Sequence, residues 1–179
     1  MNSSLNNPIV KHLVLVGGGH SHLAVLKSLG MKPVPGLAVT LISRDIKTPY
    51  SGSLPAYITG FFDFDSIHID LRPLAQFAGA RIIQEELTNI DFDKKTIELS
   101  SSRPNIEFDL ISLNIGSKPD AVKIPGAAEF AIGIKPIDLF LKRWEEIYQT
   151  IIDGYKSKGA SFSLAVVGGG PASIEFAFA

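Results

Sequence analysis

One segment, KHLVLVGGGHSHLAVLKSLG at residues 11–30, joins three different patterns without a break. The apolar, β-branched run at 12–16 is typical of a strand that is buried on both faces in a parallel sheet. Three consecutive glycines follow, and after Gly19 three leucines recur on or near one helical face. The segment therefore predicts a strand, a glycine turn and a helix in direct succession.

A glycine turn that leads into a helix can bind an anion, because the first N–H groups of the helix have no partner within it and its dipole is positive there. Gly17 and Gly19 supply two of the three small residues of the dinucleotide-binding fingerprint G-x-G-x-x-G/A, and His22 occupies the third place. That third residue normally lets helix and strand pack closely. We therefore expect His22 either to widen this packing or to turn its ring outward. A glycine turn without a ligand is the alternative.

Composition limits the chemistry and the partners of the chain. Its 179 residues include 17 Lys+Arg and 18 Asp+Glu, so it lacks the basic excess of a protein that binds nucleic acid. It contains no cysteine, which excludes disulfides, thiolate metal ligands and a redox-active cysteine pair within this chain.

The first ten residues, MNSSLNNPIV, lack the basic head and apolar core of a signal peptide. No apolar run reaches the roughly 20 residues that a membrane-spanning helix needs. We therefore expect a cytoplasmic protein with a disordered lead-in at residues 1–10, and peripheral contact with a membrane remains open.

A second buried strand is predicted at residues 37–42, LAVTLI, and it ends in Ser43-Arg44-Asp45. In a dinucleotide-binding fold this strand end reaches the ribose, where an acidic residue is usual. Ser43 can hydrogen-bond a hydroxyl, and Arg44 can meet a phosphate or lie over an adenine ring. A solvated turn is the alternative.

The middle of the chain departs from a strict alternation of strands and helices. Alternating apolar residues predict strands at 87–92, 96–99 and 107–113, which form a small antiparallel meander before the chain returns to the parallel sheet. A further strand at 81–84 follows a helix in the later part of 69–78, and a long amphipathic helix begins at Pro136.

The opening motif then returns about one domain later. An apolar strand predicted at 163–167 is followed by Gly168-Gly169-Gly170-Pro171-Ala172-Ser173 and the start of a helix. Two such units are hard to explain except by two dinucleotide sites. The expected fold is α/β: a Rossmann-like, dinucleotide-binding domain at 11–159 with a parallel sheet, helices and the small meander, and then the truncated start of a second Rossmann-like domain at 160–179.

Several strings carry a family resemblance: LVLVGGGHSHLAVLKSLGM, VTLISRDIKTPYSG, SLNIGSKPD and KPIDLFLKRWE. They resemble the two-dinucleotide-binding-domain flavoproteins, or pyridine nucleotide-disulfide oxidoreductases, in their type II NADH dehydrogenase-like branch. Within that branch the chain is most similar to the flavoprotein region fused ahead of selenide, water dikinase. The resemblance implies an FAD-dependent NAD(P)H dehydrogenase-like oxidoreductase, of which this chain is an N-terminal fragment, inactive alone. Hydride would pass from NAD(P)H to FAD.

The resemblance also assigns cofactor-binding roles by position. The FAD pyrophosphate would lie against Gly17, Gly19, His20 and Ser21, and the adenosine against Ser43, Arg44 and the Glu86-Leu87 backbone. The flavin would lie beside Tyr50 and Ser51, and Gly116 would form the glycine turn after the meander. Gly168 and Gly170 would approach the NAD(P)H pyrophosphate. Departures from the family pattern are His22 and Ser173 at the small third position and Ser53 where close relatives usually have Met.

Without cysteine, electrons would leave the reduced flavin directly, to a quinone, oxygen, a one-electron carrier or a selenium species. No catalytic base is identified. His20 and His22 stand two residues apart with no third ligand, which is poor metal geometry, so no metal is expected. A non-redox, nucleotide-binding module that regulates a fused kinase is the competing hypothesis.

Overall fold

The computed structural model describes residues 8–117 and 123–179, so most of the predicted lead-in lies outside the described residues. The chain divides into two compact units. The first consists of Met1–Thr48 and His68–Gly116, and the second of Pro49–Ile67 and Ser117–Ala179.

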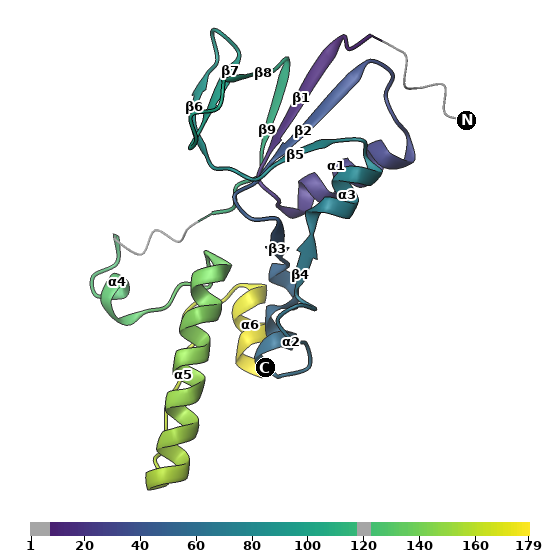
Figure 1. Ribbon diagram of the computed structural model, residues 1–179. Helices are drawn as coiled ribbons and strands as arrows, with labels where there is room; N and C mark the ends of the chain where they lie inside the picture. The colour runs from purple at the N-terminus through teal and green to yellow at the C-terminus, as the bar shows by residue number, and fades with distance from the viewer. Residues whose placement is uncertain (1–7, 118–122) are drawn as a thin grey trace. The chain divides into compact units, whose positions relative to one another are not determined.

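A four-stranded parallel sheet forms the centre of the first unit (Figure 1). Its order is β5-β2-β1-β9, from β1 (Lys11–Val16), β2 (Leu37–Ile42), β5 (Arg81–Ile83) and β9 (Leu110–Leu113). Parallel neighbours need crossover connections, and α1 (His20–Met31) supplies the first, between β1 and β2. This arrangement confirms the predicted α/β fold with a Rossmann-like parallel sheet.

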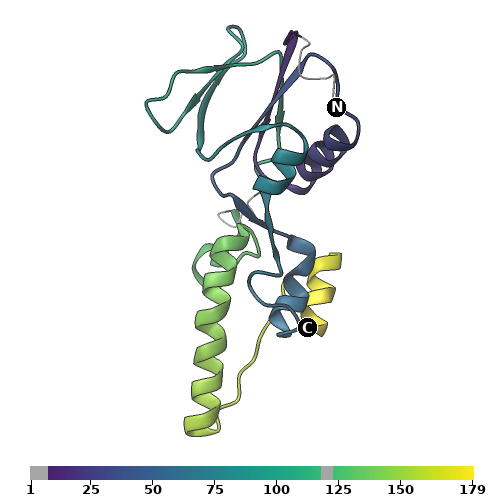
Figure 2. The same ribbon diagram turned by 45° about the vertical axis from the view of Figure 1, so that its right-hand side comes forward.

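The parallel sheet is covered on both faces because successive side chains of a strand point to opposite sides. On one face, Leu15 and Leu41 pack with residues of α1 and of α3 (Leu71–Phe77), which lie on the same side of the sheet in both views (Figures 1 and 2). On the other face, Val14, Val16 and Ile42 pack against residues of a second, smaller sheet. This two-sided burial explains the near-continuous apolar runs of β1 and β2.

The smaller sheet is the predicted meander, with order β6-β7-β8. It consists of β6 (Leu87–Asp91), β7 (Thr96–Leu99) and β8 (Ile106–Glu107), paired antiparallel. The single strand expected at 107–113 was wrong. β8 ends at Glu107 and β9 begins at Leu110, since the chain changes partner there from antiparallel β7 to parallel β1. A short two-stranded sheet also pairs β3 (Lys47–Pro49) with β4 (His68–Asp70).

The second unit has a small aromatic core. Leu54, Ile67, Phe140 and Leu141 are buried together, and the ring of Phe140 meets Phe176 edge-on at 5.6 Å between centroids. The helices that contribute to this core are α2 (Leu54–Ile58), α5 (Ile137–Lys158) and α6 (Pro171–Phe178). The unit also contains η2 (Ser51–Ser53) and α4 (Ala127–Phe130). The long helix predicted from Pro136 is therefore confirmed as α5. Gly159 ends it in the left-handed conformation at φ 59°.

The strand predicted at 163–167 is not formed. A strand requires hydrogen bonds to a neighbour, and within the described ranges no segment pairs with this one. Val167 is 89% exposed and Leu164 is 65% exposed, so the apolar pattern is present without the burial that it predicts.

The end of β9 encloses the turn between β1 and α1. Gly17 has φ 95°, and a side-chain carbon built on it would overlap the backbone carbonyl of Asn114. A carbon on Gly19 would overlap the carboxamide of the same residue. The N–H of Asn114 donates to the carbonyl of Val16 at 2.8 Å, which holds the two segments together. The backbone just after β9 therefore requires glycine at 17, whereas at 19 the overlap is with a side chain that can rotate away.

Replacing Gly17 tests this close approach. Gly79 is a matched control, because it has φ 63° but nothing within 4 Å of an added carbon. Gly79→Ala should lower the free energy of unfolding by about 1–2 kcal/mol, the cost of a left-handed backbone. Gly17→Ala should lower it by a further ~1–3 kcal/mol, because β9 must shift to admit the methyl group. Urea unfolding of this chain measures both, and equal losses would contradict the enclosed turn.

Asp70 caps the start of α3 and has a lowered pKa. Its side chain accepts a hydrogen bond from the backbone N–H of Arg72 at 3.0 Å and pairs with that residue's guanidinium at 2.6 Å. These hydrogen bonds and the positive charge lower the pKa of Asp70 to about 2.

This shift makes stability depend on pH. Because the folded-state pKa lies below the ordinary 3.8, the contribution of Asp70 is complete above 3.8 and is lost as the pH falls toward about 2. Asp70→Asn can still cap α3 but carries no charge, so its stability should fall less steeply over that window. Thermal unfolding from neutral pH down to about pH 2 compares the two proteins. A constant difference in melting temperature across the range would contradict the assignment.

Candidate functional site

Four strand ends meet at one edge of the parallel sheet. The register pairs Val16 with both Ile42 and Leu113, and Ile42 with Ile83, so the carboxyl ends of the four strands are level. Open α/β sheets bind ligands outside this edge. The residues of the first unit that we predicted to bind FAD follow these strand ends. They are Gly17, Gly19, His20 and Ser21 after β1, Ser43 and Arg44 after β2, Glu86 and Leu87 after β5, and Gly116 after β9.

The amino end of α1 lies at this edge and has no acidic neighbour of its own. Gly19 is its N-cap and supplies no side-chain hydrogen bond, and the first turn contains no acidic residue. The side chain of Ser21, in that turn, is exposed. The positive dipole end of this three-turn helix is thus not countered by a side-chain cap or by an acidic residue of its first turn, which favours an anion there. A pyrophosphate is the anion that the sequence predicts here.

Ser43 and Arg44 differ in how firmly they are held. Ser43 is 7% exposed, and its hydroxyl donates to the carbonyl of Asp45 at 2.7 Å, which leaves the hydroxyl oxygen able to accept. Arg44 pairs with the Asp45 carboxylate at 2.8 Å, but both side chains are more than half exposed, and such pairs contribute little. Ser43 is therefore a fixed group at the edge, whereas Arg44 can exchange its partner.

Glu86 is tied to the meander by its backbone. Its carbonyl accepts a hydrogen bond from the N–H of Ser100 at 2.9 Å, and its own N–H donates to the hydroxyl of Ser100 at 3.4 Å. Leu87 packs against the buried cluster under the small sheet. These contacts fix the Glu86-Leu87 backbone at the sheet edge, while contact with an adenine remains a prediction.

His22 does not turn its ring outward, which was one of the two arrangements that the sequence suggested. Its ring is 2% exposed and turns inward, where Nδ1 lies 2.8 Å from the carbonyl oxygen of Gly17 and Nε2 lies 3.0 Å from the hydroxyl of Ser112. Sequence reasoning missed Ser112. The available signal was a single polar residue within the apolar strand LISL, because a polar group in such a position needs a partner.

The other predicted residues lie in the second unit. The N–H of Tyr50 donates to the carbonyl of Ile67 at 2.8 Å, and Ser51 begins η2. The second glycine turn repeats the backbone of the first: Gly168 has φ 129°, and Gly170 caps α6 with φ −80° and ψ 168°, against φ −69° and ψ 166° at Gly19. The structure thus brings the predicted residues of the first unit together at one edge. Tyr50, Ser51, Gly168 and Gly170 belong to the second unit.

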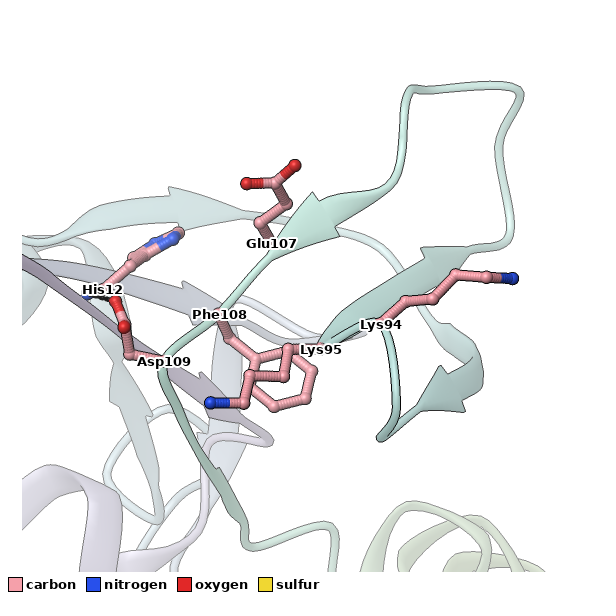
Figure 3. A pocket seen from close by; sticks show the side chains of 6 residues that line it. All are labelled: His12, Lys94, Lys95, Glu107, Phe108 and Asp109. Atoms are coloured by element: carbon pink, nitrogen blue, oxygen red, sulfur yellow. Dashed lines mark hydrogen bonds between the residues drawn. The ribbon is translucent and has the colours of Figure 1, made fainter.

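Two shallow pockets lie at the opposite, amino edge of the sheet. One, of about 310 Å³, is lined by His12, Lys94, Lys95, Glu107, Phe108 and Asp109 (Figure 3). The other, of about 440 Å³, shares His12 and Glu107 with it and is also lined by Arg81 and Arg103. Asp109 lies beside the start of β1, accepts hydrogen bonds from Lys11 Nζ at 2.9 Å and from the N–H of His12 at 2.7 Å, and has its pKa lowered by them. Its carboxylate holds the strands together and lies far along β1 from the glycine turn.

Comparison with known proteins agrees with this geometry. The chain matches the model of the family described as pyridine nucleotide-disulphide oxidoreductase over residues 11–179. It is 26% identical to the mitochondrial external alternative NAD(P)H-ubiquinone oxidoreductase B4 of Arabidopsis thaliana, over 95% of this chain and 31% of that protein. It is 27% identical to the mitochondrial external NADH-ubiquinone oxidoreductase 2 of Saccharomyces cerevisiae, over 93% of this chain and 33% of that protein. The chain thus spans about a third of the length of these relatives.

Solved structures share the fold. NDH2 from Plasmodium falciparum superposes with a TM-score of 0.75 at 21% identity, over 93% of this chain and 35% of that one. A ferredoxin reductase from Rhodopseudomonas palustris superposes with a TM-score of 0.70 at 23% identity, over 93% of this chain and 39% of that one. With the family model matched from Lys11 to the last residue, the chain belongs to the pyridine nucleotide-disulphide oxidoreductase family.

Proposed function

We propose that this chain is the FAD-binding part of an FAD-dependent NAD(P)H oxidoreductase, with the beginning of its NAD(P)H-binding domain at residues 160–179. The observation that carries the proposal is the N-terminus of α1, which has no side-chain cap and no acidic residue in its first turn. It follows a glycine turn and lies with Ser43 at the edge where α/β sheets bind ligands. Membership of the family and relatives named as NAD(P)H-ubiquinone oxidoreductases support it.

The residues at this edge fit the parts of FAD. The backbone from Gly17 to Ser21 would hold the pyrophosphate, and Ser43, Arg44 and the Glu86-Leu87 backbone would hold the adenosine. In the second unit, Tyr50 and Ser51 would lie beside the flavin, and Gly168 and Gly170 would receive the NAD(P)H pyrophosphate. FAD, when bound, supplies the group that accepts hydride from the nicotinamide and passes electrons on.

The electron acceptor that we propose is a quinone. The chain has no cysteine, so a thiol relay within it is excluded, and the relatives in Arabidopsis thaliana and Saccharomyces cerevisiae are named for ubiquinone. None of the described helices has the length and hydropathy of a membrane span. Our proposal for the location is the one that the sequence predicts, a cytoplasmic protein with room for peripheral membrane contact. Fusion to selenide, water dikinase is a finer proposal that rests on the sequence resemblance alone.

An absorbance spectrum of the full-length protein tests the proposed function. Flavin bands that bleach when NADH or NADPH is added without oxygen are the expected result, and the effective donor would identify the nicotinamide preference. A full-length protein that takes up no flavin after incubation with FAD would overturn the proposal and favour the regulatory nucleotide-binding module instead.

A charge placed in the first turn of α1 tests the pyrophosphate site directly. Ser21→Glu puts a carboxylate where the pyrophosphate should lie, and should weaken FAD binding about tenfold or more by repulsion. The same carboxylate is favourable for the helix dipole, so the melting temperature of the protein without FAD should not fall.

Ser28→Glu is the matched control, because Ser28 is an exposed serine near the other end of the same helix. It adds the same charge about two turns away from the site and should leave FAD affinity unchanged. Flavin-fluorescence titration measures both variants. Equal dissociation constants for Ser21→Glu and Ser28→Glu would show that the pyrophosphate lies elsewhere.

A further inference from the structure

The imidazole of His22 is a buried bridge between the glycine turn and β9. Gly17 contributes a carbonyl oxygen 2.8 Å from Nδ1, and a carbonyl can only accept, so Nδ1 must carry the hydrogen. Nε2 of a neutral ring is then an acceptor, and the hydroxyl of Ser112 donates to it over 3.0 Å. One neutral tautomer satisfies both contacts, with the ring only 2% exposed.

This bridge determines which way one peptide of the turn faces. The carbonyl of Gly17 and the N–H of Gly18 belong to the same planar trans peptide and therefore point in opposite directions. Because the carbonyl points to the buried ring, the N–H of Gly18 must point away from it. Gly17 has a φ of 95°, in the left-handed region. Glycine has several backbone conformations open to it, so without the bridge this peptide could rotate to other orientations.

The bridge also explains how a histidine can stand where the fingerprint has a small residue. A small side chain would bring α1 and the sheet together by close packing. At His22 the ring fills the space, and its Nε2 contact with Ser112 ties α1 to β9 as its Nδ1 contact ties α1 to the turn. The spacing between helix and sheet is thus fixed by two hydrogen bonds instead of by the absence of a side chain.

We propose that His22 and Ser112 form a positioning pair that fixes the peptide between Gly17 and Gly18 and so orients the N–H groups offered to the FAD pyrophosphate. This inference rests on the proposed function. It assigns to Ser112, a residue that does not touch the proposed cofactor site, an effect on cofactor affinity through His22.

A second histidine supplies the matched control. Nε2 of His12 lies 2.9 Å from the hydroxyl of Thr40, in the same sheet but near the amino end of β1, and the same kind of bond there touches no part of the turn. Ser112→Ala and Thr40→Val each remove one hydroxyl partner of an imidazole. Only Ser112→Ala should weaken FAD binding, by roughly three- to tenfold, whereas both should lower the melting temperature.

Variants of the ring itself provide a rescue test. His22→Ala should weaken FAD binding by roughly tenfold or more, because it removes both hydrogen bonds and leaves a cavity. His22→Asn retains an N–H donor near the place of Nδ1 and should recover part of that affinity. If Ser112→Ala binds FAD as tightly as Thr40→Val, or if His22→Asn is no better than His22→Ala at equal stability, the positioning role is wrong.

Nitrogen NMR of the imidazole in the full-length protein without FAD separates the failure of this inference from the failure of the proposed function. The expected result is a neutral His22 ring with its hydrogen on Nδ1, and a displaced Gly18 amide resonance in Ser112→Ala but not in Thr40→Val. A ring with its hydrogen on Nε2, or an unmoved Gly18 resonance, would overturn the positioning pair. A full-length protein that binds no FAD but shows the expected ring would instead overturn only the cofactor assignment.

Discussion

The parallel pairing of β1 with β2 on one side and β9 on the other is the constraint on which the first unit depends. It brings the strand ends level, so that the turn after Val16 lies between the turns after Ile42 and Leu113. It also brings the backbone of Asn114 so close to the glycine turn that a side chain at 17 is excluded, and it places Ser112 within reach of His22. The shape of the turn and the exposure of the α1 end are consequences of this pairing.

The sequence predicted well what depends on local pattern. Strand, glycine turn and helix at 11–30, the second strand, the meander and the long helix from Pro136 all have a period or a turn signal that the structure confirms. It failed where the outcome depends on a distant partner. One apolar run at 107–113 changes its neighbour at Phe108-Asp109, and the apolar run at 163–167 has no neighbour among the described strands.

The same distinction applies to the candidate site. Gly17, Gly19 and Ser43 could be found from their positions after strands, because parallel strands end at one edge. The roles of His22, Ser112 and Asn114 could not, since they depend on contacts across about ninety residues of sequence. Gly17 therefore has a structural role of its own, because it admits the backbone after β9, besides the approach to an anion that we propose for the turn. The strand, glycine turn and helix are formed although His22 breaks the sequence fingerprint.

The central claim is that an anionic nucleotide binds at the carboxyl edge of the sheet and not in the pockets at the amino edge. An amide-resolved NMR titration of this chain with FAD tests it most directly, because it detects weak binding and assigns it to residues. The account predicts that the largest changes occur at Gly18, Gly19, His20 and Ser21, with smaller ones at Ser43. Changes concentrated at His12 and Glu107–Asp109 instead would contradict it.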